Sequence, residues 1–340
     1  MMLKRIGCSL LLSIASGMGA DQPSNLDNLA SKFSYMDLNR SANLQRGGSN
    51  SLSPQIMHNL EEKSAQGDPY ASLQLASVYY CQDEKGKAKD IIRFLTIAAD
   101  AGISQACFIL GASCLEEKLG LKKTDVRLLK YLTIAAGANY PKAIVALAKY
   151  YWEEGKHRDI DLSIKWLEKG VALNDDASLF MYGVLLRNGS EIKADYPRAR
   201  RFFEIAASLN NAHALALLGI MHQQGQEGEQ DFPQAASLYL RAIQLDPYQD
   251  QALANLGLLY YNGHGVPPDP IQSQTYLERS AGLNNVVAQR MLGLFFLKGD
   301  FFKQDLVQGM KYLSQAAEQG DSLAIYTVAA LRLSGIGPEI

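Results

Sequence analysis

Two glycines with a histidine between them are the residues that most resemble a chemical site. Gly263 and Gly265 follow an apolar run and precede two prolines in the stretch "GLLYYNGHGVPPDP". Glycine-rich loops that open a helix often bind phosphate through backbone N–H groups. No lysine followed by serine or threonine completes that motif, and the same turn returns as "LSGIGPEI". The recurrence instead predicts a helix-ending turn, in which glycine adopts a positive φ without steric cost.

Other patterns for catalysis or metal binding are missing from the sequence. It contains no HExxH, no paired CxxC and no GxSxG motif. Its histidines are scattered along the chain: His58, His157, His213, His222 and His264. We therefore predict no catalytic residue, no metal site and no cofactor. Carboxylates that meet only after folding leave no sequence pattern, so an enzyme remains an alternative.

The cysteines could do redox or structural chemistry. Cys107 and Cys114 lie seven residues apart on one predicted helix. That separation is about 10 Å along the helix axis, which is too far for a disulfide between them. A disulfide between Cys81 and either of them remains open. Small buried apolar side chains are the interpretation that we favour for all three.

The charge pattern bears on the class of partner. The formal net charge is −2, and basic and acidic residues are mixed along the chain. No basic run of the kind that binds nucleic acid is present, and no acidic tail. We therefore predict a protein or peptide partner and no nucleic acid.

The first residues predict export. Two cations in "MMLKR" precede a short apolar stretch, and Ala20 is a small residue suited to a cleavage site. We predict a signal peptide over residues 1–20 and a secreted or periplasmic protein. No later segment has transmembrane length. Residues 21–52 are rich in Ser, Asn, Asp and Gly without any period, which predicts a disordered tether.

The remaining chain repeats with a period near 36 residues. An alanine-like residue stands five positions before a second small residue in Ala71/Ala76, Ala106/Gly111, Ala143/Ala148, Ser178/Gly183, Ala214/Gly219, Ala252/Gly257, Ala288/Gly293 and Ala324/Ala329. A bulky ring precedes the next alanine in each repeat: Phe94, Tyr131, Trp166, Phe202, Tyr239, Tyr276 and Tyr312. The spacing predicts two amphipathic helices per repeat, called A and B. We expect the ring of B to pack beside the small residue of A.

These positions resemble the Sel1-like repeat, a relative of the tetratricopeptide repeat. Repeat 6 matches it most fully, with Ala252, Leu256, Gly257, Tyr260, Gly263, Gly265, Val266, Asp269 and Tyr276 all in place. The resemblance implies an all-α fold, an α–α superhelix (solenoid) of about eight helical hairpin repeats. It assigns residues 53–68 to an N-terminal capping helix and residues 69–340 to the solenoid, whose last repeat is incomplete.

The resemblance also implies where a ligand binds. In tetratricopeptide arrays a concave groove is lined by A helices, at positions −6, −3, +1, +4 and +5 from the second small residue. Transferred to this sequence, the partner-binding groove comprises Tyr80, Phe108, Lys149, Trp152, Phe180, Arg187, Gln223, Tyr261, Arg290 and Tyr326, with Tyr70, Gln224 and Asn262 at further such positions. Rings beside amides and cations suit an extended peptide. Packing of these rings against the next repeat is the alternative.

Three functions follow as hypotheses. The first is an exported interaction scaffold that binds a protein or peptide in envelope assembly or host contact, as the resemblance implies. The second is an envelope enzyme or enzyme activator acting on peptidoglycan or β-lactams. The regular cysteine pairs of the β-lactam-linked relatives are missing here, so that activity is not transferred. The third is a structural subunit that forms a homodimer through its C-terminal helix.

Overall fold

The computed structural model describes residues 54–333, except residues 84–85, 154, 156, 190–191, 227 and 300–301. Within these ranges all regular structure is α-helical. The helices are α3 (Pro54–Ala65), α4 (Pro69–Asp83), α5 (Ala88–Asp100), α6 (Ser104–Leu115), α7 (Arg127–Gly137), α8 (Pro141–Trp152), α9 (Ile160–Ala172), α10 (Asp176–Asn188), α11 (Tyr196–Ser208), α12 (Ala212–Gln224), α13 (Phe232–Leu245), α14 (Asp250–Asn262), α15 (Pro270–Gly282), α16 (Val286–Lys298), α17 (Leu306–Glu318) and α18 (Ser322–Leu333). The predicted all-α fold is confirmed.

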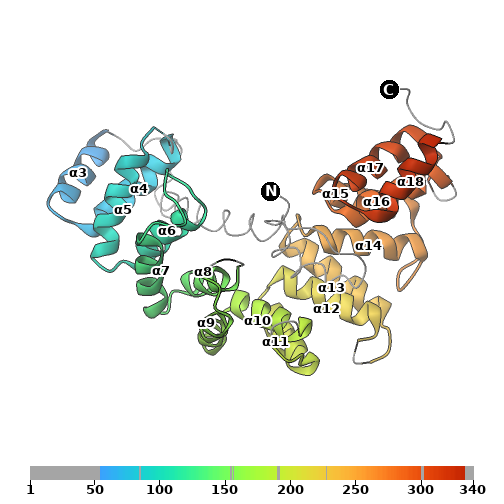
Figure 1. The fold of residues 1–340 in the computed structure, drawn as a ribbon, viewed down its shortest axis with the longest axis horizontal. Helices are drawn as coiled ribbons and strands as arrows, with labels where there is room; N and C mark the ends of the chain where they lie inside the picture. The colour runs from blue at the N-terminus through green and yellow to red at the C-terminus, as the bar shows by residue number, and fades with distance from the viewer. Residues whose placement is uncertain are drawn as a thin grey trace. The chain divides into compact units, whose positions relative to one another are not determined.

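Successive helices alternate between the two predicted types (Figure 1). The even-numbered helices from α4 to α18 are A helices, and the odd-numbered ones from α3 to α17 are B helices. A helices such as α12, α14 and α16 pack on the B helix that follows, and B helices such as α13 and α15 pack on the next A helix. This pattern of stacked hairpins is the expected α–α solenoid fold.

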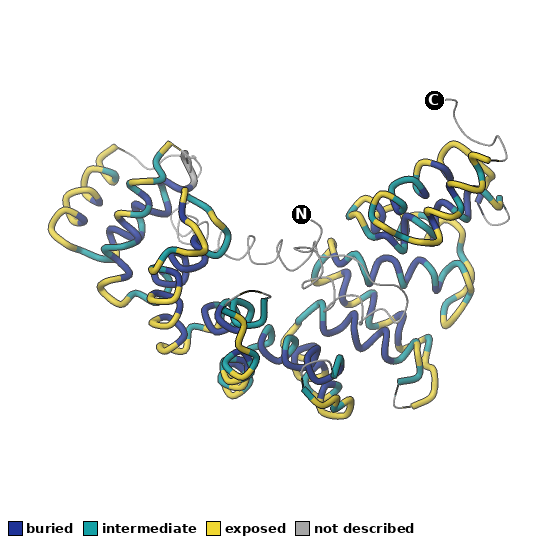
Figure 2. Tube along the Cα trace, in the orientation of Figure 1, coloured by how far each residue is buried: buried dark blue, intermediate teal, exposed yellow. Residues whose placement is uncertain are grey.

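The chain divides into two compact units between Ser178 and Leu179, within α10. We call the described residues up to 178 the N-terminal unit and those from 179 the C-terminal unit. In both units most helices bury one side and expose the other (Figure 2). This is the one-sided burial that amphipathic periodicity predicts.

In repeats 4 to 7 the turn between the A helix and the B helix contains a glycine with left-handed backbone geometry and an aspartate that caps the B helix. Gly263, directly after α14, has φ 68°, and Gly265 has φ 72°, which confirms the predicted helix-ending turn. Asp269 then caps α15, because its Oδ1 accepts hydrogen bonds from the backbone N–H groups of Ile271 and Gln272. The second copy of this turn, at Gly335 and Gly337, lies outside the described residues.

The small residues of the A helices meet large side chains at close range. A Cβ added to Gly219 would stand 2.5 Å from Tyr239, and one added to Gly183 would stand 2.7 Å from Phe203. In repeat 4 the residue in contact is therefore Phe203 and not the predicted ring, Phe202. Repeat 6 shows the same one-residue difference, because Leu277 and not Tyr276 faces Gly257. Repeats 2 and 7 show it as well, because Leu132 faces Gly111 and Leu313 faces Gly293. The sequence predicted the close approach correctly, but among these five glycines it predicted the facing residue correctly only for Gly219.

The N-terminal predictions fall largely outside the described residues. Residues 1–53, which hold the predicted signal peptide, the tether and the first residue of the predicted capping helix, are not described. The α3 helix begins at Pro54 and packs on α4. Among the described helices, none is both long and apolar enough to cross a membrane.

Two of the three cysteines in the repeats have described side chains. Cys107 and Cys114 are free thiols, and both are fully buried in α6. Burial raises the pKa of the Cys114 thiol to about 11, so the thiol stays protonated near neutral pH. Both side chains therefore act as small apolar groups, as the sequence predicts. The side chain of Cys81 lies outside the described residues.

Candidate functional site

The ten residues predicted to line a groove differ widely in exposure. In the N-terminal unit Tyr80 and Phe108 are buried, whereas Lys149 and Trp152 are half-buried. In the C-terminal unit Arg187 is buried, and Phe180, Gln223, Tyr261 and Arg290 are half-buried. Tyr326 on α18 is 72% exposed. The predicted positions therefore share a helix type and a register but not a common accessibility.

Several of the predicted rings pack against the next repeat. Tyr261 of α14 stacks on Phe295 of α16, with ring centroids 3.8 Å apart. Phe108 of α6 lies against Tyr140, at the start of α8, with a centroid distance of 5.5 Å. Such contacts join neighbouring A helices and cover part of each ring. Large substitutions here would change repeat packing as well as any binding.

Several of the predicted polar residues are also engaged within the protein. The Tyr239 hydroxyl donates to Gln223 Oε1 at 2.8 Å. Arg290 forms an ion pair with Asp321, the residue before α18, with Nη1 and Oδ2 2.6 Å apart. Burial lowers the pKa of the Arg187 guanidinium below its ordinary value. These side chains contribute to the packing of successive repeats.

Four side chains at the predicted groove positions are exposed to solvent. Gln224 and Asn262 are exposed at the same position of α12 and α14, directly before the turn glycine of each. Tyr70 and Tyr326 are exposed near the two ends of the described chain. The sequence identified these four positions by register, but it did not distinguish them from the buried ones.

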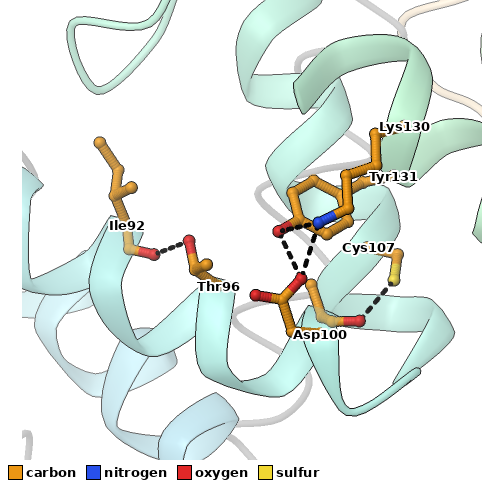
Figure 3. A network of polar contacts seen from close by, with 7 residues as sticks. Ile92, Thr96, Asp100, Cys107, Lys130 and Tyr131 are labelled. Atoms are coloured by element: carbon orange, nitrogen blue, oxygen red, sulfur yellow. Dashed lines mark hydrogen bonds and ion pairs between the residues drawn. The ribbon is translucent and has the colours of Figure 1, made fainter. Parts of the chain in front are cut away.

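A cluster of polar groups joins α5 to α7 (Figure 3). Asp100 Oδ1 accepts hydrogen bonds from Lys130 Nζ at 2.9 Å and from the Tyr131 hydroxyl at 2.8 Å. These donors hold the pKa of the Asp100 carboxyl below its usual range. The buried Cys107 thiol nearby donates to the Ala99 carbonyl oxygen, and burial raises its pKa. The cluster thus contains a protonated thiol and no activated nucleophile.

Cations of other B helices also reach the end of the preceding B helix, which supports a structural role for the cluster. Lys169 Nζ donates to the carbonyl oxygen of Ala136, near the end of α7, at 2.6 Å. Arg241 donates to the carbonyl oxygen of Ala207, near the end of α11, at 3.1 Å. Cations at helix C-termini complement the unpaired carbonyl groups and the helix dipole. Lys130 likewise reaches the end of α5, but it bonds the side-chain carboxylate of Asp100 and not a carbonyl group.

The histidines remain scattered in the described structure. His213 Nδ1 lies 2.7 Å from Gln249 Nε2, and its ring packs on Phe180. His157 stacks on Tyr150, and His264 packs on Phe232. Over the described ranges no three His, Cys, Asp or Glu residues gather in a way that could hold a metal ion.

The fold and this face define a class of protein. Hairpins of one A and one B helix stack within each unit and present a repeated set of positions on successive A helices, as in α-helical repeat proteins. The chain belongs to the Sel1 repeat family, whose model matches residues 141–175, 176–211, 212–247, 250–285 and 286–321. The resemblance drawn from the sequence is thereby confirmed. The family model does not reach the hairpins of α4 to α7.

Solved structures support the same fold. The chain is similar to c5321, a protective antigen of uropathogenic Escherichia coli with an SLR fold, at 24% identity and a TM-score of 0.66. That match covers 83% of this chain but 61% of the antigen, so the chain spans less than two thirds of its length. A Sel1 repeat protein from Oxalobacter formigenes is 27% identical, with a TM-score of 0.62 over 68% of this chain and 95% of that one. No curated protein sequence matches significantly.

Proposed function

We propose that the chain is a non-catalytic scaffold that binds a protein partner along its A helices. Sel1 repeat proteins generally mediate protein–protein interactions. The observation that carries the proposal is the A-helix face of α12, α14 and α16, whose positions hold amides, rings, apolar groups and cations but no carboxylate. Gln224 and Asn262 repeat on this face. A side-chain amide both donates and accepts, as the main chain of an extended partner requires.

The double substitution Gln224→Ala/Asn262→Ala tests this face. Both side chains are exposed, so the fold should be retained. We expect affinity for the natural partner to fall about 10- to 30-fold, because two hydrogen bonds of about 1 kcal/mol each are lost. The partner would be captured from extracts of the native cell, purified and titrated calorimetrically. Gln234→Ala/Gln272→Ala on α13 and α15 is the matched control, and equal affinity of the two double variants would contradict the proposal.

We place this scaffold outside the cytoplasm, in envelope assembly or host contact. The support is the pattern of residues 1–20, in which a cationic start precedes a short apolar stretch and a small residue. Protein isolated from its own organism is then expected to begin after Ala20 or a few residues earlier. An intact N-terminal sequence beginning at Met1 would contradict export by this route.

Self-association through α18 is a second candidate, favoured by one observation. Ile325 is 48% exposed, whereas Leu215 and Leu253, at the same position of α12 and α14, are fully buried. Ala329 is likewise exposed where Gly219 and Gly257 are buried. Ile325 and Ala329 are thus exposed on the side of α18 that corresponds to the B-helix contact in other repeats. An exposed apolar face of this kind commonly binds another protein surface.

The substitution Ile325→Asp tests this candidate. If two copies pair through α18, light scattering of the unchanged protein should show a mass that rises with concentration toward a dimer. Ile325→Asp should weaken the dimer at least tenfold, because a carboxylate would be buried at the contact. Ile271→Asp, on the exposed side of α15, is the matched control. A constant monomer mass at high concentration would rule out the second candidate.

A further inference from the structure

A pocket of about 550 Å³ lies beside the turn between α10 and α11, wholly within the C-terminal unit. Tyr182 and Leu186 of α10 and Ile192 of the turn provide apolar lining, and the partly exposed Tyr196 contributes a further ring. Arg198 lies at the pocket with its guanidinium 5.2 Å from the centroid of the Tyr182 ring. The pocket is large enough for an aromatic side chain and is lined by groups that would contact one.

Repeat 7 has an equivalent turn of the same length and closure. The Asp195 N–H donates to the Leu186 carbonyl oxygen at 2.9 Å, and the Asp305 N–H donates to the Phe296 carbonyl oxygen at 3.0 Å. Both aspartates then cap the B helix that follows. Residues that stand the same number of positions before Asp195 and Asp305 in the sequence can therefore be compared directly.

The two turns differ at the residue three positions before the aspartate. In repeat 7 this residue is Phe302, which is 4% exposed and packs between Phe295 and Phe296 at centroid distances of 5.5 and 5.7 Å. In repeat 4 it is Ile192, a smaller side chain that lines the pocket. The position that a buried ring occupies in repeat 7 is thus occupied in repeat 4 by a smaller, half-buried side chain that forms one wall of the pocket.

The charge around the pocket favours an anion beside that ring. Lys193 and Arg198 line it and are both exposed. The carboxylate of Asp195 already accepts a hydrogen bond from the Arg198 backbone N–H at 3.0 Å, as the cap of α11. The N-terminus of α11, a helix of 13 residues, adds the positive end of its dipole. A carboxylate next to a bound ring would be stabilised by Lys193, by Arg198 and by the N-terminus of α11.

We propose that this pocket binds an aromatic residue of the protein partner that is adjacent to an acidic residue in the partner's sequence. The ring lies against Tyr182, Leu186 and Ile192, and the carboxylate pairs with Lys193 and Arg198. Arg198 also stacks against the ring, as cations do on aromatic faces. The inference rests on the proposed scaffold function and adds a second, side-chain-specific contact to the A-helix face.

The probe is a fluorescent five-residue peptide with the core Asp-Phe-Glu, titrated into the full chain by anisotropy. Methyl NMR of Leu186 and Ile192 would report the place of binding. We expect both methyl signals to shift on saturation, with no binding when Phe in the probe is replaced by alanine. Replacing both acids by lysine should weaken binding at least tenfold. An alanine probe that binds as tightly would overturn the proposal.

Two variants of the protein complete the test. Ile192→Phe should narrow the pocket and weaken probe binding at least fivefold, with an unchanged circular dichroism spectrum. Lys193→Glu should weaken binding about five- to tenfold, since it replaces an attraction by a repulsion. Lys303→Glu, the same substitution two residues before Asp305, should leave binding unchanged. Normal binding by folded Ile192→Phe, or equal losses for the two lysine variants, would overturn the proposal.

The same variants separate this inference from the scaffold function. If Ile192→Phe keeps full affinity for the natural partner while Gln224→Ala/Asn262→Ala loses it, the pocket proposal is wrong and the scaffold function stands. If Ile192→Phe lowers that affinity at least fivefold, both are supported. If the partner binds both variants as tightly as the unchanged protein, neither surface mediates the interaction.

Discussion

Replacing Gly219 by alanine is expected to lower the free energy of unfolding by about 2–3 kcal/mol. The new methyl group would stand 2.5 Å from Cε1 of Tyr239, which is far inside van der Waals contact. Tyr239 cannot easily move, because its ring is fully buried and its hydroxyl donates to Gln223. Overpacking of this kind typically costs about 1–3 kcal/mol. Helix propensity alone would favour alanine by about 1 kcal/mol, so any loss measures the steric conflict.

Two further variants make this result specific. Gly282→Ala, at the end of α15, adds a methyl group that meets nothing within 4 Å, so its stability should be unchanged or slightly higher. The double variant Gly219→Ala/Tyr239→Leu should recover part of the loss in stability. Repeats 1 and 3 already combine an alanine and a buried leucine at the equivalent positions, namely Ala76 with Leu95 and Ala148 with Leu167. Stability would be measured from urea midpoints. Equal midpoints for Gly219→Ala and Gly282→Ala would contradict the close packing.

The repeat and its turns could be predicted from the sequence because they depend on local spacing. Helix type follows from apolar periodicity, and the end of α14 follows from Gly263, where a left-handed conformation favours glycine. Small residues such as Gly219 and Gly257 mark close helix crossings wherever they recur. These features need no knowledge of which neighbour each side chain meets.

The candidate site was predicted only in part, because accessibility depends on contacts between repeats. Gln224 and Tyr261 both belong to the predicted face, yet Gln224 is exposed while Tyr261 stacks on Phe295 of the following A helix. Periodicity gives the direction of a side chain from its own helix axis but not the distance to the next helix. The pocket at Ile192 escaped notice for a related reason. It is formed by Tyr182 and Leu186 of α10 together with residues 192–198, which come together only in the folded chain.

The register of the large residues was the other failure, and Phe202 and Phe203 show why. Adjacent residues in a helix point in directions that differ by about 100°. Where two rings are adjacent, sequence spacing alone does not determine which of them is buried. The spacing to the next alanine favoured Phe202. The structure instead places Phe203 against Gly183, fully buried, while Phe202 is half-exposed and lies 5.3 Å from the Arg198 guanidinium.

Alanine substitutions at these two neighbours should therefore differ strongly in effect. Phe203→Ala is expected to cost about 3–5 kcal/mol, the range for a buried aromatic ring that leaves a cavity. Phe202→Ala should cost about 1 kcal/mol, because it removes a partly solvated ring together with its contacts to the Tyr182 ring and the Arg198 guanidinium. Urea unfolding followed by circular dichroism would compare the two under identical conditions. The two variants delete the same atoms from adjacent residues of α11, so helix propensity and composition cancel, and the difference reports which ring is buried beside Gly183. Equal losses, or a larger loss for Phe202→Ala, would show that the spacing was right and the packing described for repeat 4 is wrong.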